Sequence, residues 1–377
     1  MTKYFFYLLL LLSACNSAVQ KTEIADTPTK IIRPKYAQGF WIEVFKDHKI
    51  IHVRNAYDTT QVIENYIIAN NKKSVPDNAT FIQAPVRKNV SLSTTQIGFL
   101  QELNLIDSII AVSDAERIFN KNVHANISSG KTQTIGNYNG INEEKILSLQ
   151  PSLVFAYSFT EGNSSLPKLK SLGLKIVLVN DYNEIHPLAR AEWVKMIAAF
   201  YDREALADSV FSEVEQEYLQ LSEMAKGVVQ KPDVFCNLPW KEIWYMPSGK
   251  SYFAKFIDNA GGNYLWKNDT SSRTLNLDFE AVFARAAQAP IWLNPNSAKN
   301  LKEIGAQDSK FQLFKAFKAG EVFNNNRMEN AGGGNAFWET GVAKPNIVLK
   351  DLIRIFHPEL LPNYQLMYYQ KLENDRR

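Results

Sequence analysis

Apolar residues recur in two different patterns along the chain, and the change from one to the other marks its main divisions. Between Gly39 and Val53, apolar and polar residues alternate on either side of a charged turn, which predicts a β-hairpin. From Val90 onward, short and fully apolar segments alternate with segments whose apolar residues lie three or four apart. Fully apolar strands separated by helices are typical of a parallel sheet that is covered on both faces. The pattern up to residue 186 therefore predicts an α/β lobe.

A long helical segment separates this lobe from a second alternating set. Helical spacing of apolar residues runs from Pro187 to about Lys226, and a break near Tyr201 stays open. Beyond Lys231 strands and helices alternate again, which predicts an α/β protein of two Rossmann-like lobes joined by a single long linker helix. The predicted boundaries are 1–14 for a leader, 15–38 for a polar tether, 39–186 for the N-terminal lobe with its added β-hairpin, 187–226 for the linker helix, 227–362 for the C-terminal lobe and 363–377 for a polar tail.

The first residues have the pattern of an export signal. Lys3 precedes an uncharged apolar run that, as a helix, rises about 14 Å, too short for a hydrocarbon core of about 30 Å. Such a run is typical of the apolar region of a signal peptide. The segment Leu12-Ser13-Ala14-Cys15 resembles a bacterial lipobox, in which the cysteine receives lipid. We therefore expect a protein of the cell envelope, anchored through Cys15 on the periplasmic face or at the outer membrane; an ordinary cleaved signal is the alternative.

Composition excludes several classes of protein. The chain has 42 basic and 39 acidic residues, a net charge of +3, which argues against nucleic acid as a partner. Five histidines leave little room for a metal site built from several convergent imidazoles. If Cys15 carries lipid, Cys236 remains as the other cysteine and has no partner for an internal disulfide. The sequence therefore predicts no cofactor, no resident metal ion and no nucleic-acid partner.

One element occurs twice, once in each predicted lobe. Glu144 and Glu280 each lie at the start of a short helix that leads into a buried strand. A glutamate in the first helical turn is stabilised by the helix dipole by roughly 0.3–1 kcal/mol. A purely local role at the helix start therefore stays open for both residues.

The repeated element also carries a family resemblance. The stretch 136–154 is similar to the "G…N-x-E-x-I-x-x-L-x-P-D-L-V" stretch of iron-siderophore and vitamin B12 substrate-binding proteins of ABC importers. Segments 91–95, 172–176, 259–263 and 357–359 resemble further motifs of that family in the same order. The resemblance implies a class III, two-lobed periplasmic-binding-protein fold. It also implies a non-enzymatic receptor that captures a siderophore, haem or cobamide and delivers it to a dimeric ABC permease. Glu144 and Glu280 match the two positions that meet arginines of the permease in this family.

Candidate ligand-binding residues follow the strands of both lobes. The carboxyl ends of parallel strands form the crevice in which α/β folds bind ligands. Aromatic rings can cover the flat apolar surface of a chelate while an arginine neutralises its charge; an anchoring role in the core is the alternative for each ring. Glu184, Arg190 and Glu192 are expected on a solvated face at the start of the linker helix, with a ligand role as the alternative. The predicted ligand-binding residues are Thr95, Asp114, Arg117, Tyr138, Tyr157, Trp240, Trp244, Tyr245, Arg327 and Trp338.

Two other classes of function stay open at this point. Gly249-Lys250-Ser251 resembles the end of a phosphate-binding loop, but Trp244 stands where that motif requires its first glycine. A two-lobed envelope enzyme would need a nucleophile beside a base, and the sequence shows no such pair. An envelope lipoprotein that binds a polymer or a partner protein is the other alternative. Aromatics gathered in the crevice would favour the receptor, and an open aromatic stripe would favour the lipoprotein.

Overall fold

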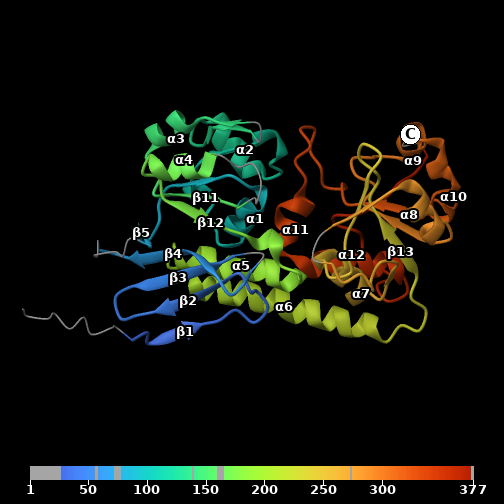
Figure 1. Ribbon diagram of the computed structural model, residues 1–377, viewed down its shortest axis with the longest axis horizontal. Helices are drawn as coiled ribbons and strands as arrows, with labels where there is room; N and C mark the ends of the chain where they lie inside the picture. The colour runs from blue at the N-terminus through green and yellow to red at the C-terminus, as the bar shows by residue number, and fades with distance from the viewer. Residues whose placement is uncertain are drawn as a thin grey trace, which may run out of the picture.

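The computed structural model describes residues 27–55, 58–71, 78–137, 140–158, 165–271 and 274–374. Two α/β lobes stand side by side, and helix α6 (Glu204–Lys226) runs beneath them (Figure 1). Within the described residues there are three five-stranded sheets, one in each lobe and one formed by the N-terminal strands. In the same residues, no helix is both long enough and apolar enough to cross a bilayer.

The N-terminal lobe is built on a parallel sheet with the strand order β12-β11-β6-β7-β8. Strands β6 and β11 are buried at every position, as expected for a sheet with both faces covered. Ser93 begins α1 with a capping box, in which the Gln96 side chain returns to the N-cap backbone. The elements of this lobe are β6 (Asn89–Ser91), α1 (Thr94–Glu102), η1 (Ile106–Ser108), β7 (Ile109–Val112), η2 (Ala115–Arg117), α2 (Lys121–Ser128), β8 (Gln133–Thr134), β9 (Gly136–Asn137), β10 (Gly140–Ile141), α3 (Glu143–Leu149), β11 (Leu153–Ala156), α4 (Ser165–Ser171), β12 (Ile176–Leu178) and η3 (Asp181–Asn183).

The C-terminal lobe has the strand order β15-β13-β17-β18-β19, parallel except for β19. Its core is aromatic: the Phe235 ring stacks on Trp292 at 4.9 Å and on Phe314 at 5.0 Å between ring centroids. The elements are β13 (Asp233–Cys236), β14 (Trp244–Met246), α7 (Tyr252–Asn259), β15 (Asn263–Tyr264), β16 (Leu275–Leu277), α8 (Phe279–Ala286), β17 (Ile291–Leu293), α9 (Leu301–Gln307), η4 (Ser309–Leu313), α10 (Lys315–Ala319), β18 (Val322–Asn324), η5 (Ala336–Trp338), α11 (Thr340–Ala343), α12 (Pro345–Phe356) and β19 (Gln370–Lys371).

The helical segment between the lobes is interrupted. Helix α5 spans Pro187–Ala199, and α6 begins at Glu204. Asp202, between them, has a positive φ of 53°, a left-handed conformation that cannot continue a right-handed helix. The predicted helix over 187–226 is therefore two helices, and α6 is the one that extends from beneath one lobe to beneath the other (Figure 1).

The N-terminal strands form a sheet that is larger than the predicted hairpin. β1 (Lys30–Ile32), β2 (Phe40–Val44), β3 (Lys49–Arg54), β4 (Val62–Ala69) and β5 (Thr80–Gln83) lie in that order. The pairs are antiparallel except β4 with β5. Phe40, on the inner face, packs its ring 5.0 Å from Trp193 of α5. Residues 30–32, expected to be part of a tether, instead pair with β2, so the tether prediction is wrong for this segment.

Two buried carboxylates hold the N-terminal segment against the start of α5. Glu192 accepts hydrogen bonds from the backbone N–H groups of Lys35, Tyr36 and Ala37 at 2.8–3.0 Å. Glu184 accepts from the N–H groups of residues 38 and 39 and from the Trp193 indole. Both glutamates are buried, and so is Arg190. The predicted solvated helix face is therefore wrong for all three residues.

The C-terminal residues also belong to the lobe. The buried Asp351 carboxylate of α12 accepts backbone N–H groups of Met367, Tyr368 and Tyr369 at 2.6–2.9 Å. These bonds lead the chain into β19, which pairs with β18. The segment predicted as a polar tail is thus integrated in the C-terminal sheet as far as residue 371.

Candidate ligand-binding cleft

A cavity of about 780 Å³ is lined by residues from both halves of the molecule. One part of its wall follows β12 and comprises residues 182–185, the first two of which belong to η3. The rest comes from the carboxyl ends of C-terminal-lobe strands, the start of α7 and Trp338. The lining residues are Tyr182, Asn183, Glu184, Ile185, Asn237, Tyr245, Pro247, Ser248, Lys250, Ser251, Tyr252, Phe253, Thr274, Asn294, Asn296, Asn325 and Trp338.

Asparagines follow three neighbouring strands at this wall. Asn237 comes directly after β13, Asn294 directly after β17, and Asn325 directly after β18. The first two have positive φ values of 65° and 54°, a conformation that asparagine tolerates better than most residues. Because the three strands are parallel neighbours, their ends bring the amides together at one edge of the sheet.

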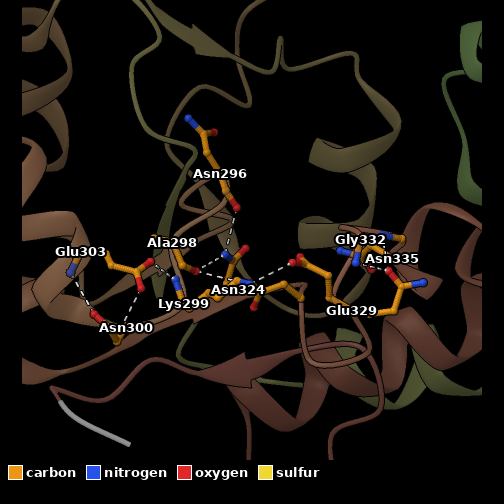
Figure 2. Close-up of polar contacts among 12 residues, drawn as sticks. Asn296, Ala298, Lys299, Asn300, Glu303, Asn324, Glu329, Gly332 and Asn335 are labelled. Atoms are coloured by element: carbon orange, nitrogen blue, oxygen red, sulfur yellow. Dashed lines mark hydrogen bonds and ion pairs between the residues drawn. The ribbon is translucent and has the colours of Figure 1, made fainter. Parts of the chain in front are cut away.

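The wall behind these residues is fixed by a second set of hydrogen bonds. Asn324, buried at the end of β18, donates its amide to the backbone oxygens of Asn296 and Ala298 at 3.0 and 2.7 Å. Figure 2 shows this amide at the centre of the network, with Asn300 and Glu303 bonded to each other at the start of α9. An ion pair between Lys299 and Glu329, 3.5 Å apart, lies beside it. The loop after β17 is therefore held in place independently of any ligand.

Trp338 lies where three hollows of the molecule meet. It borders the main cavity, a second hollow of about 280 Å³ and a narrow apolar recess behind α7. Its side chain is 44% exposed, and its ring stands edge-on to Phe337 at 4.7 Å between centroids. Trp338 and Tyr245, both predicted ligand-binding residues, thus line the cavity.

The second hollow brings together three further predicted residues. Asp114 and Arg117 follow β7, Tyr157 follows β11, and all three line this hollow with Trp338. Burial, and then the nearby Asp114 carboxylate, raise the pKa of the Tyr157 hydroxyl above its ordinary value. The phenol therefore remains protonated at neutral pH and can donate a hydrogen bond.

A buried ion pair lies next to the cleft. The Arg190 guanidinium bonds Asp181 through Nη2 at 2.8 Å and covers the Tyr252 ring at 4.6 Å. Thr95 donates its hydroxyl to the same carboxylate at 3.3 Å, so it supports this pair and is not one of the residues that line the cavity. Tyr252 lines the cavity and was missed by the sequence analysis, because its context on a helix gives no sign of the Arg190 guanidinium that packs on it.

Three other predicted residues occupy different places. Trp244 is fully buried, donates its indole N–H to the Cys236 carbonyl at 2.8 Å and packs on Trp292, so its assignment to the ligand is wrong. Trp240 is 64% exposed and pairs with Ile243 at the base of a tight turn, outside the cavity lining. Arg327 is exposed and lies outside that lining too. Tyr138 and Cys15 lie outside the described residues.

The two repeated glutamates occupy equivalent helix positions. Glu144 is the second residue of α3 and Glu280 the second residue of α8, behind the N-caps Asn142 and Asp278. Both N-cap side chains accept a backbone N–H of the first turn, at 2.8 and 2.7 Å. Both glutamates are exposed, and one lies in each lobe (Figure 1).

No group of three or more histidine, cysteine, aspartate or glutamate side chains within the described ranges is arranged to hold a metal ion. The polar groups of the cleft are chiefly amides and hydroxyls, which suit hydrogen bonding to an organic ligand.

The fold and the cleft define a two-lobed α/β binding protein of the class III type. The family model for periplasmic binding proteins matches residues 90–325, so the chain belongs to the periplasmic binding protein family. The predicted fold class and the resemblance to this family are confirmed. The matched residues do not include the N-terminal sheet, the segment 326–344 that leads to α12, or the C-terminal strand β19.

The chain is also similar to individual proteins and solved structures over most of its length. The chain is 28% identical over 315 residues to the uncharacterized lipoprotein MJ0878 of Methanocaldococcus jannaschii, covering 81% of this chain and 73% of that one. The structure of the periplasmic vitamin B12 binding protein BtuF of Vibrio cholerae matches with a TM-score of 0.52 and 16% identity, over 72% of this chain and 96% of that one. A periplasmic heme binding protein from Pseudomonas aeruginosa matches with a TM-score of 0.55 and 14% identity, over 73% and 94%. At these identities the solved structures establish the fold.

Proposed function

We propose that this chain is the substrate-binding component of an ABC importer, which captures a metal chelate between its lobes and delivers it to the permease. The chelate is an iron-siderophore, a haem-like molecule or a cobamide. The observation that carries the proposal is the cavity between the lobes, where Tyr182, Tyr245 and Trp338 border a wall of amides. Aromatic faces can cover a flat chelate while the amides bond its polar edge.

The comparisons support the class of ligand and the location. The two solved structures named above are of a vitamin B12 binding protein and a heme binding protein, and both ligands are bulky metal chelates. The relative from Methanocaldococcus jannaschii is a lipoprotein by name, which supports a lipid anchor at Cys15 and a place in the cell envelope. With a lipid anchor and the receptor body in one chain, the captured ligand stays close to the membrane.

The position of the aromatics favours the receptor over the alternatives. Tyr182, Tyr245 and Trp338 line a cavity and do not form a stripe across an open face. A polymer or a partner protein would need such an open platform. The exposed Trp240 lies at a single turn outside the cavity lining.

Ligand binding tests the proposal directly. The purified full chain in detergent is titrated with a ferric siderophore, haem and cobalamin, with tryptophan fluorescence and calorimetry read together because these ligands absorb light. We expect saturable submicromolar binding of one class, weakened at least about fivefold by Trp338→Ala, since one aromatic contact contributes about 1 kcal/mol beyond its buried area.

The matched control is Trp41→Ala on the N-terminal sheet, where Trp41 stacks on His52 at 4.3 Å, away from the cavity lining. It should leave the affinity unchanged. Failure of all three chelate classes to bind would contradict the proposed function.

A further inference from the structure

The main cavity is rich in uncharged hydrogen-bonding groups and poor in cations. Five of its lining residues are asparagines, whereas its charged lining residues are Glu184 and Lys250. The Glu184 oxygens are already engaged by two backbone N–H groups and the Trp193 indole. Arg190, which lies behind Tyr252, is paired with Asp181. Among the described lining residues, Lys250 is therefore the one cation that faces a ligand in the main cavity.

Hydrogen bonds to backbone carbonyls of the cavity wall fix the orientation of two of these asparagine side chains. Asn237 donates its Nδ2 to the Tyr245 carbonyl at 2.7 Å, and Asn296 donates its Nδ2 to the Leu238 carbonyl at 3.0 Å. A carbonyl partner fixes which end of each amide is the nitrogen, so Oδ1 is the group left to accept a hydrogen bond. Figure 2 shows the Asn296 side chain standing clear of the Asn324 network, which holds only its backbone oxygen.

The backbone alone does not account for asparagine at these positions. Asn237 and Asn296 have positive φ values of 65° and 48°, a conformation that aspartate and glycine also tolerate. Aspartate would have added negative charge to the wall, and glycine would have removed the acceptor. Asparagine supplies acceptors while leaving the wall neutral.

On the basis of the proposed receptor function, we propose that this wall selects chelates whose periphery carries neutral N–H or O–H donors, such as carboxamides, and rejects chelates that carry carboxylates. Carboxamide N–H groups can bond the Asn237 and Asn296 oxygens. An ionised carboxylate has no N–H or O–H group to donate to those oxygens. Burying it beside them would leave an uncompensated charge. Lys250 could balance one such group, and the Asp114–Arg117 hollow adds one charge of each sign.

Calorimetry with neutral and anionic chelates tests this selectivity. The full chain in detergent is titrated with cyanocobalamin and ferrichrome, which carry amides and no net carboxylate charge, and with haem and ferric citrate. We expect one of the neutral pair to bind at least tenfold more tightly than either carboxylate-bearing chelate. Tighter binding of haem or ferric citrate would overturn the inference and leave the receptor function standing. No binding of any of the four would overturn both.

Replacing both asparagines by glycine tests whether their amides cause the selectivity. The double variant Asn237→Gly/Asn296→Gly removes both amides at positions where glycine accepts the backbone conformation. It should lower the affinity for the neutral chelate at least tenfold. Asn104→Gly is the matched control, because Asn104 has a φ of 57° and is exposed in the N-terminal lobe, outside the cavity lining. Unchanged affinity in the double variant, with an unchanged melting temperature, would refute the role of these two amides.

Discussion

At the scale of single residues, packing between the lobes buries side chains and so changes their pKa, as at Glu339. Glu339 follows Trp338 and is fully buried; its Oε2 accepts the backbone N–H of Phe119 in the N-terminal lobe at 2.9 Å. Its Oε1 has no hydrogen-bond partner among the described residues. Burial raises the pKa of this carboxyl from 4.5 to about 7, although the N–H donors oppose the shift. A carboxyl next to the ligand cleft is thus close to its titration point at neutral pH.

Glu339 should make the fold less stable as the pH rises. Its pKa is raised in the folded state, so its contribution to stability is fully present below about pH 4.5 and is lost as the pH rises through about 7. We expect the free energy of unfolding of the wild type to fall relative to that of Glu339→Gln by on the order of 3 kcal/mol between pH 4 and 8. Urea unfolding at several pH values measures the difference. Its titratable neighbour Tyr368 has a pKa raised to about 12 by burial and stays neutral throughout. Parallel pH profiles of the two proteins would contradict the prediction.

At the scale of elements, the N-terminal strand depends on a helix that is distant in sequence. The Glu192 carboxylate on α5 accepts the N–H groups of residues 35, 36 and 37, just after β1. Glu215 on α6 adds bonds to the Lys35 ammonium and the Tyr36 hydroxyl. The segment that connects the body to its predicted anchor is therefore attached to both helices between the lobes.

Removing the Glu192 charge should release this strand. In Glu192→Gln one acceptor becomes an N–H₂ donor that faces backbone donors, and hydrogen bonds to a charged group contribute about 1.5–3 kcal/mol each. We expect a loss of about 2–3 kcal/mol in unfolding free energy and faster amide exchange in β1. Glu213→Gln, on the exposed side of α6, is the control and should change neither quantity. Protection of β1 at the wild-type level in Glu192→Gln would show that the side chain does not hold the segment.

The dependence of some elements on tertiary contacts explains which elements could be predicted from the sequence. Strands such as 153–156 are apolar at every position, so the local sequence pattern alone predicts their burial. β1 is short and partly polar, and β19 consists of two polar residues; they become strands through β2 and β18, which the sequence does not place beside them. Trp244 and Trp338 look alike as loop tryptophans, yet an aromatic core surrounds the first and a cavity borders the second. Burial of Glu192 and Arg190 likewise depends on tertiary partners.

At the scale of the whole molecule, a second connection accompanies α6. The segment 325–344 leaves β18, contacts the N-terminal lobe and returns to α12 (Figure 1). On the way, Asn330 donates to the Ile118 carbonyl at 2.7 Å, and Lys344 pairs with Glu102 at 2.9 Å. These contacts limit the freedom of the lobes to separate. We therefore expect the carboxylates at the starts of α3 and α8 to keep a nearly constant spacing.

A constant spacing lets two weak contacts act together on a two-fold permease. We propose that Glu144 and Glu280 dock on permease arginines, so that reversing one charge leaves a partial contact and reversing both abolishes it. In cells that depend on this chain for chelate uptake, Glu144→Lys/Glu280→Lys should reduce uptake at least tenfold and each single variant less. Ligand affinity should be unaffected, because both residues are exposed and outside the cavity lining. Glu213→Lys on α6 controls for the change in net charge of each single variant. Normal uptake by the double variant would exclude this docking mode, and a matching loss of ligand affinity would place the defect in the cleft instead.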